Sequence, residues 1–185
     1  MRIVPLFLGV LLCASSAMAQ LVAPNQVGVR MGHMHLAVRD VDAQRAFWVN
    51  TMGGTVVKNG PLELIQFPGV FVMLRKADTP ASPADAIVNH FGFTVKDMKV
   101  ALAKWKAAGV EIEPTENPNE VYVHGPDGIR VEVYGEPALP TPVSMNHIHF
   151  YPNRADVPTI KRWYVTPSAR IRGGGRASRV SPLRG

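Results

Sequence analysis

The stretch His33-Met-His-Leu-Ala-Val-Arg-Asp40 occurs in related form at two later places, His90-Phe-Gly-Phe-Thr-Val-Lys-Asp97 and His147-Ile-His-Phe-Tyr-Pro-Asn-Arg154. The leading histidines are 57 residues apart each time. The three tryptophans of the chain follow at matching places, 15 residues after the first and second of these histidines and 16 after the third. Such spacing is not expected by chance, so the sequence predicts copies of one structural unit.

Each copy begins with an alternating run, rich in β-branched and aromatic residues, that is typical of a strand. Asp40 and Asp97 close the first two runs, where a carboxylate can accept the free N–H groups of a helix start. Apolar residues at helical spacing follow, and glycines end both segments as C-caps. The predicted helices are Val41 to about Met52 and Met98–Ala108.

Three short strands are expected after each helix, with a turn at Pro126-Asp127-Gly128. They are Thr55–Lys58, Leu62–Phe67, Val70–Arg75, Val110–Glu113, Val121–His124 and Ile129–Tyr134. The unit is therefore β-α-β-β-β, made at 31–75 and again at 90–135, and the fold class is α+β. A proline-rich linker (136–145) leads to a third, incomplete unit at 146–165, and a basic tail fills 166–185.

The N-terminus has the pattern of a secretory signal peptide over residues 1–19. Arg2 precedes an apolar run from Ile3 to Ala14, and Ala17-Met-Ala19 supplies the small residues before cleavage. The run is shorter than the ~20 residues of a membrane span, and a buried N-terminal helix is the structural alternative. We expect export to the periplasm or the medium. Cys13, the only cysteine, would be removed, which excludes disulfides, thiolate metal sites and cysteine catalysis in the mature chain.

The net charge of +6 does not indicate a nucleic-acid partner. Six arginines lie near the ends: Arg2, Arg170, Arg172, Arg176, Arg179 and Arg184. The remainder of the chain carries equal numbers of basic and acidic residues. A protein that contacts phosphate backbones needs a basic patch, and the body of this sequence offers none.

These repeated motifs, together with Gly128-Ile-Arg-Val-Glu-Val-Tyr134, resemble the vicinal oxygen chelate superfamily. That superfamily includes glyoxalase I, methylmalonyl-CoA epimerase, extradiol dioxygenases, and bleomycin and fosfomycin resistance proteins. The resemblance covers 31–135 completely and 146–165 in part. It implies that the two complete units pair as one eight-stranded cup around a divalent metal ion.

The resemblance implies His33, His90 and Glu132 as metal ligands. Two imidazoles and a carboxylate leave coordination positions open for a substrate. Strand parity agrees, because residues i and i+2 share a face, and each of these three lies on the polar side of its strand. Surface or hydrogen-bonded histidines are the structural alternative. The expected cofactor is one divalent metal ion, with iron, manganese, zinc and nickel as the candidates.

The fourth strand of the first unit departs from the glyoxalase I pattern. That enzyme takes a glutamate or glutamine ligand from about here, whereas residues 69–74 are Gly and apolar types only. The ligand count therefore leans toward the extradiol dioxygenases. His35 is the candidate acid–base residue, or it orients a ligand. Arg130 either pairs with a substrate carboxylate or makes an ion pair within the protein.

Two function classes remain open from the sequence. The first is a metal-dependent lyase, isomerase or ring-cleaving dioxygenase acting on a small substrate with adjacent oxygens. The second is a resistance-type module that binds a small molecule without chemistry. A truncated product without function is a third reading. The partner in the first two is a small molecule, with no membrane span and with a possible homodimer.

The sequence changes character at Thr166-Pro-Ser-Ala-Arg170, after which no acidic residue occurs. An Asn-Thr-Phe-Gly-Ala stretch that loses one base can be read as these five residues. We therefore hypothesise a frameshift in a longer, two-cup protein, with a natural basic tail as the alternative. On either reading the third strand and helix are expected to lack partners and to be loosely attached.

Overall fold

The computed structural model describes residues 23–166, except 25, 27 and 79–85. The predicted signal peptide at 1–19 and the basic tail beyond residue 166 lie outside the described residues. Within the described part, no helix is long and apolar enough to cross a membrane.

Two β-α-β-β-β units follow one another along the chain, which confirms the predicted α+β class. The first contains β1 (His33–Val38), α1 (Val41–Ala46), β2 (Thr55–Asn59), β3 (Leu62–Phe67) and β4 (Val70–Lys76). The second contains β5 (Val88–Val95), α2 (Met98–Ala107), β6 (Ile112–Pro114), β7 (Glu120–His124) and β8 (Arg130–Gly135). β9 (Val143–Phe150) and α3 (Val157–Val165) begin the third. The first helix is shorter than predicted, because Phe47–Thr51 continues it as a π-helical segment.

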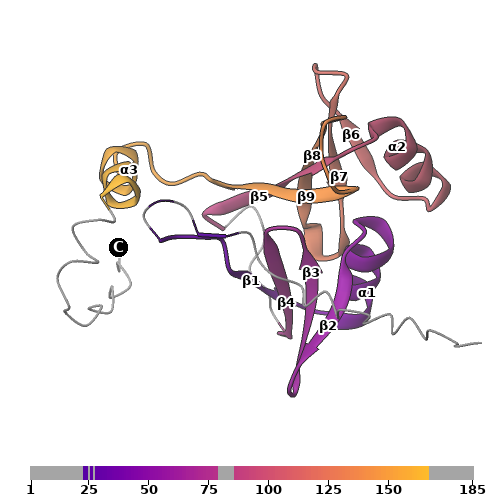
Figure 1. Ribbon diagram of the computed structural model, residues 1–185, viewed down its shortest axis with the longest axis horizontal. Coiled ribbons are helices and arrows are strands. Elements are labelled where there is room, and N and C mark those ends of the chain that lie inside the picture. The colour runs from indigo at the N-terminus through magenta and orange to yellow at the C-terminus, as the bar shows by residue number, and fades with distance from the viewer. Residues whose placement is uncertain (1–22, 25, 27, 79–85, 167–185) are drawn as a thin grey trace, which may run out of the picture.

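The strands form two mixed sheets, which Figure 1 shows one above the other. The four-stranded sheet has the order β1-β4-β3-β2, and β1 runs parallel to β4. The five-stranded sheet has the order β6-β7-β8-β5-β9, and β5 runs parallel to β8. The two units thus share one internal topology, as the repeat predicts.

The third unit supplies a partner strand, so the expectation that β9 would lack one is wrong. β9 pairs antiparallel with β5, from Val88 opposite Phe150 to Val95 opposite Val143. The open edge of β5 presents unpaired backbone N–H and C=O groups, and β9 satisfies them. In contrast, α3 lies beyond the end of β9, away from both sheets in Figure 1, and its Trp163 is half exposed.

The capping residues are where the sequence places them. The Asp40 carboxylate accepts hydrogen bonds from the backbone N–H groups of Asp42 (2.9 Å) and Ala43 (3.0 Å). Asp97 accepts one from Val100 (2.9 Å). The predicted C-cap glycines have left-handed backbone angles, with φ of +85° at Gly53 and +67° at Gly109. These caps fix where each helix leaves its first strand.

The apolar faces of the two sheets meet in one shared core. Trp48, from the π-helical segment, is fully buried with its ring 5.9 Å from that of Phe93 on β5 and 6.1 Å from that of Phe67 on β3. Phe67 and Phe93 contact each other edge to face at 4.9 Å. In turn, the Trp105 indole of α2 donates to the backbone carbonyl of Thr51 (2.9 Å). The tryptophan of each unit therefore contacts the other unit.

A buried amide also joins the units. Gln44 is fully buried on α1, and its carbonyl accepts from the Trp48 indole (3.1 Å). Its amide nitrogen donates to the Pro126 carbonyl (2.8 Å) and to the Asp127 carboxylate (3.3 Å). Both ends of the side chain are satisfied, so its burial carries no penalty for an unpaired polar group. The two units are fixed face to face by polar as well as apolar contacts.

Replacing Trp48 with alanine is expected to lower the free energy of unfolding by about 3–5 kcal/mol, because it opens a cavity in the shared core. Trp163→Ala is the matched control, since that side chain is half exposed, and a change within about 0.5 kcal/mol is expected there. Urea unfolding followed by circular dichroism measures both. Equal losses for the two variants would contradict a core organised around Trp48.

Candidate metal centre

The site lies on the polar face of the five-stranded sheet, away from the shared core. Along β5 and β8 the apolar side chains alternate with polar ones, and the apolar set faces the core. The opposite side chains of β5, β7, β8 and β9 form what we call the polar face: His90, Thr94, Tyr122, Arg130, Glu132, Tyr134, His147 and His149. The predicted strand parity of His90 and Glu132 therefore holds.

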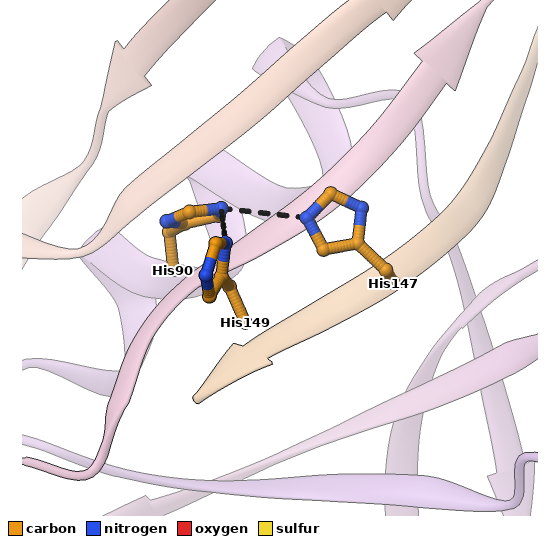
Figure 2. Close-up of side chains that lie close together, drawn as sticks. All are labelled: His90, His147 and His149. Carbon is orange, nitrogen blue, oxygen red and sulfur yellow. Dashed lines mark hydrogen bonds between the residues drawn. The ribbon is translucent and has the colours of Figure 1, made fainter. Parts of the chain in front are cut away.

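Three imidazoles converge on this face (Figure 2). One ligand atom from each of His90, His147 and His149 lies within 4.8 Å of the others. Nε2 of His90 is 3.4 Å from Nε2 of His147 and 3.2 Å from Nδ1 of His149. His90 comes from β5, and the other two come from β9, which the pairing of these strands brings alongside.

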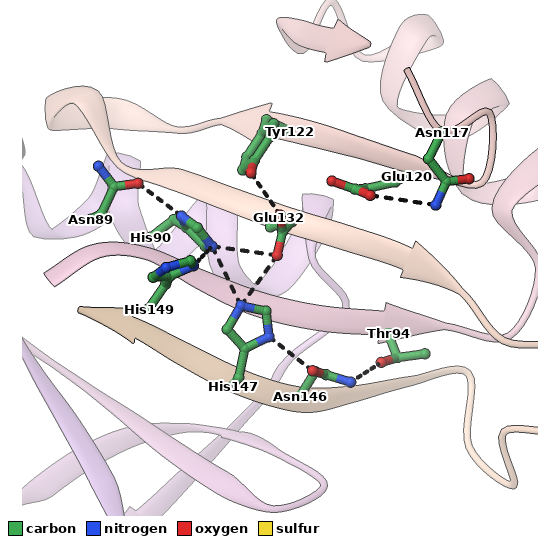
Figure 3. Close-up of polar contacts among 10 residues, drawn as sticks. All are labelled: Asn89, His90, Thr94, Asn117, Glu120, Tyr122, Glu132, Asn146, His147 and His149. Atoms are coloured by element: carbon green, nitrogen blue, oxygen red, sulfur yellow. Dashed lines mark hydrogen bonds and ion pairs between the residues drawn. The ribbon is translucent and has the colours of Figure 1, made fainter. Parts of the chain in front are cut away.

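Glu132 completes the cluster from β8. Its Oε2 lies 3.3 Å from Nε2 of His90 and 3.2 Å from Nε2 of His147 (Figure 3). Its Oε1 accepts a hydrogen bond of 2.6 Å from the Tyr122 hydroxyl. The carboxylate is only 5% exposed and His90 only 2%. Two ring nitrogens and one carboxylate oxygen thus meet where His90 and Glu132 are buried and His147 is partly exposed.

The surroundings keep Glu132 ionised and His90 neutral near pH 7. Burial raises the pKa of Glu132, but hydrogen bonds from Tyr122 and Tyr134 and the nearby His90 and His147 outweigh it, so the pKa lies below its ordinary value. Burial lowers the pKa of His90, and the neighbouring carboxylate of Glu132 opposes this only in part. Burial and the Glu132 carboxylate raise the pKa of Tyr134 to about 12, so it keeps its proton. A neutral imidazole and an anionic carboxylate are the forms that bind metal ions.

Asparagines contact the far side of two of the rings. Oδ1 of Asn89 lies 2.8 Å from Nδ1 of His90, and Oδ1 of Asn146 lies 2.8 Å from Nδ1 of His147 (Figure 3). The other nitrogen of each ring, Nε2, is the one that faces Glu132. Both imidazoles are therefore held at two points.

Gly92 makes room for His147. The two residues lie opposite each other in the β5–β9 pairing. A Cβ atom at position 92 would stand 2.2 Å from two atoms of the His147 ring. Only glycine allows the ring to lie over the strand at this point.

The structure brings two of the three predicted ligands together and places the third elsewhere. His90 and Glu132 are in contact, and His147 lies beside them. His33 is on β1 of the other sheet, exposed, with its ring 4.7 Å from that of His35. Sequence reasoning did not select His147, His149 or Tyr122. A signal existed for His147: Asn-His occurs at 89–90 and 146–147, whereas Gly32 precedes His33.

The two predicted catalytic residues, His35 and Arg130, are not members of the cluster and line a separate cleft. Arg130 makes an ion pair with Glu113 (2.8 Å), and its guanidinium lies over the Tyr122 ring at 3.5 Å. This is the ion pair within the protein that the sequence offered as one of two readings. His35 and Arg130 both line a cleft of about 250 Å³ that also reaches Asn89. His35 therefore faces the same cleft as the asparagine that contacts His90.

Comparison with known proteins gives the family. Residues 30–133, more than half of the chain, match the family model of the Glyoxalase/Bleomycin resistance protein/Dioxygenase superfamily. No curated protein sequence matches the chain.

Similar solved structures are found in bacteria and protozoa. The fosfomycin resistance protein FosX of Listeria monocytogenes is 19% identical, over 56% of this chain and 88% of that one, with a TM-score of 0.46. A possible glyoxalase from Bacillus cereus is 26% identical, over 55% and 95%, with a TM-score of 0.45. The trypanothione-dependent glyoxalase I of Leishmania major is 22% identical, over 58% and 87%, with a TM-score of 0.48. By the match of residues 30–133, this chain belongs to the Glyoxalase/Bleomycin resistance protein/Dioxygenase superfamily.

Proposed function

We propose that the protein is a metal-dependent enzyme that binds one divalent ion through His90, His147 and Glu132. The observation that carries this proposal is the convergence of two Nε2 atoms and one carboxylate oxygen at 3.2–3.4 Å from one another. Ligands of one small ion, with bonds of about 2.1 Å, stand roughly 3.0–3.4 Å apart. The donor set fits a divalent metal.

The chemistry of the donors supports the same reading. Three electron-rich atoms that face one another repel unless a cation or a shared hydrogen lies between them. Burial of Glu132 and His90 strengthens that repulsion, because water does not screen it. A two-histidine, one-carboxylate set also leaves coordination positions open. His149 stands next to His90 as a further possible ligand.

The substrate proposed is a small molecule with adjacent oxygen atoms. When bound, the ion supplies a Lewis acid to such a chelating group. Tyr122 holds Glu132 in place through its hydrogen bond, and the polar face offers hydroxyl groups to orient the substrate. The reaction class proposed is a lyase, isomerase or ring-cleaving dioxygenase. We also propose that the enzyme acts after export, in the periplasm or the medium, because residues 1–19 have the pattern of a signal peptide.

The purified protein is expected to bind about one equivalent of Zn²⁺ or Mn²⁺. The Glu132→Gln variant is expected to bind neither ion tightly, because the anionic ligand is lost. Elemental analysis after metal loading and dialysis measures the stoichiometry. Glu116→Gln removes an exposed carboxylate outside the site and is the control. A folded wild-type protein that takes up no metal would contradict the proposed metal-dependent enzyme and favour a module that binds a small molecule without chemistry.

Substitution of single histidines distinguishes the observed cluster from the ligand set that the resemblance implies. His147→Ala is expected to abolish tight metal binding, whereas His33→Ala leaves it in place, because His33 lies on the other sheet. Isothermal titration with Zn²⁺ measures both. Loss in His33→Ala together with retention in His147→Ala would show that β1, and not β9, supplies the second imidazole.

Gly92→Ala is expected to weaken metal binding about 10-fold or more, because the new methyl group displaces the His147 ring. Gly32→Ala is the control, since a Cβ there has open space around it. The same Zn²⁺ titration gives the affinities, and circular dichroism checks that both variants fold. Unchanged affinity in a folded Gly92→Ala protein would mean that the His147 ring does not bind the metal from this position.

A further inference from the structure

Two irregularities in the β5–β9 pairing contain the same residue type. Val88 pairs with Phe150 and His90 with His149, so Asn89 is an extra residue on β5. Gly92 pairs with His147 and Phe93 with Met145, so Asn146 is an extra residue on β9. Both extra residues are asparagines that directly precede a clustered histidine. A bulge changes the direction of a side chain, which lets each asparagine contact the ring of its neighbour.

The hydrogen bonds of these asparagines define where each ring carries its proton. A carbonyl oxygen only accepts, so Oδ1 of Asn89 and of Asn146 require a donating Nδ1–H on the histidine that each contacts. The amide nitrogen of Asn146 donates to the Thr94 hydroxyl (3.1 Å), so both ends of this side chain have a partner. A neutral imidazole with hydrogen on Nδ1 has its lone pair on Nε2. That is the atom facing Glu132.

The alternative tautomer, with hydrogen on Nε2, would make the site less able to bind a cation. With hydrogen on Nε2, either ring would donate to Oε2 of Glu132, at the present distances of 3.3 Å and 3.2 Å. The cluster would then satisfy itself with internal hydrogen bonds and offer fewer lone pairs to a cation. A hydrogen-bond acceptor on the far side of each ring opposes that arrangement.

We propose that Asn89 and Asn146 are positioning residues that keep the Nε2 lone pairs of His90 and His147 directed at the metal. This inference rests on the proposed function. It adds two residues that fix the tautomer of the ligand histidines in the metal-free protein. It also accounts for the difference between repeats: the residue before His33 is glycine, which has no side chain to hold that ring.

The first test measures metal affinity. Asn89→Leu and Asn146→Leu remove the acceptor with little change in volume, and each is expected to weaken Zn²⁺ binding about 10–100-fold. Asn→Asp at either position keeps an acceptor oxygen and is expected to retain the affinity. Asn59→Leu, exposed on β2 of the other sheet, is the control. If a leucine variant does not fold, the alanine variant removes the same acceptor with less apolar surface.

The second test measures the tautomer in metal-free protein. Nitrogen-15 spectra of the imidazoles are expected to show hydrogen on Nδ1 of His90 and His147 in the wild type and in the Asp variants. The variant lacking the acceptor is expected to move hydrogen to Nε2 of its neighbouring ring. Unchanged tautomers and affinities would overturn the inference. A wild type that binds no metal but shows the expected tautomers would instead count against the proposed function alone.

Discussion

The burial of Trp48 between the two units is the constraint on which the rest of the structure depends. Its ring contacts Phe67 of one sheet and Phe93 of the other, so the apolar faces of both sheets must turn inward. Because side chains alternate along a strand, the polar residues of β5 and β8 must then turn outward. Glu132 and His90 are on the polar face as a direct result. An aromatic core on one side of the sheet thus determines where a polar cluster can form on the other.

The strand order within each unit places its first strand at the edge of the four strands of that unit. The edge of β5 is occupied by β9, which brings His147 and His149 to the polar face. Exposed edges are costly and prone to pairing with other strands, so a third copy of the first strand is a natural partner. The candidate metal cluster therefore needs three strands: β5 and β8 of one unit and β9, the first strand of the next.

Much of this organisation could be predicted from the sequence, because it depends on local chemistry. The caps at Asp40 and Asp97 and the strand parity follow from spacing and residue type, whereas the pairing of His90 with Glu132 was implied by the family resemblance. The partner of β5 could not be predicted in the same way. His33 and His147 occupy equivalent repeat positions, and edge pairing is a long-range choice that depends on packing. The bulges at Asn89 and Asn146 could not be predicted either, because they depend on the pairing of β5 with β9, although the Asn-His pairs themselves are visible in the sequence.

The same reasoning explains why, within the described part of the chain, the repeated fold gives one candidate metal cluster and not two. In the first unit, β1 pairs with β4 so that His35 lies opposite Met73. In the second unit, the corresponding register places Gly92 opposite Glu132. The first unit therefore has a thioether where the second has a carboxylate, and it has His35 where the second has the glycine that admits another ring. Without an anionic ligand and without that space, His33 and His35 cannot build an equivalent site on their own sheet. The repeat supplies the scaffold twice, but the ligand set depends on the substitutions at these two positions.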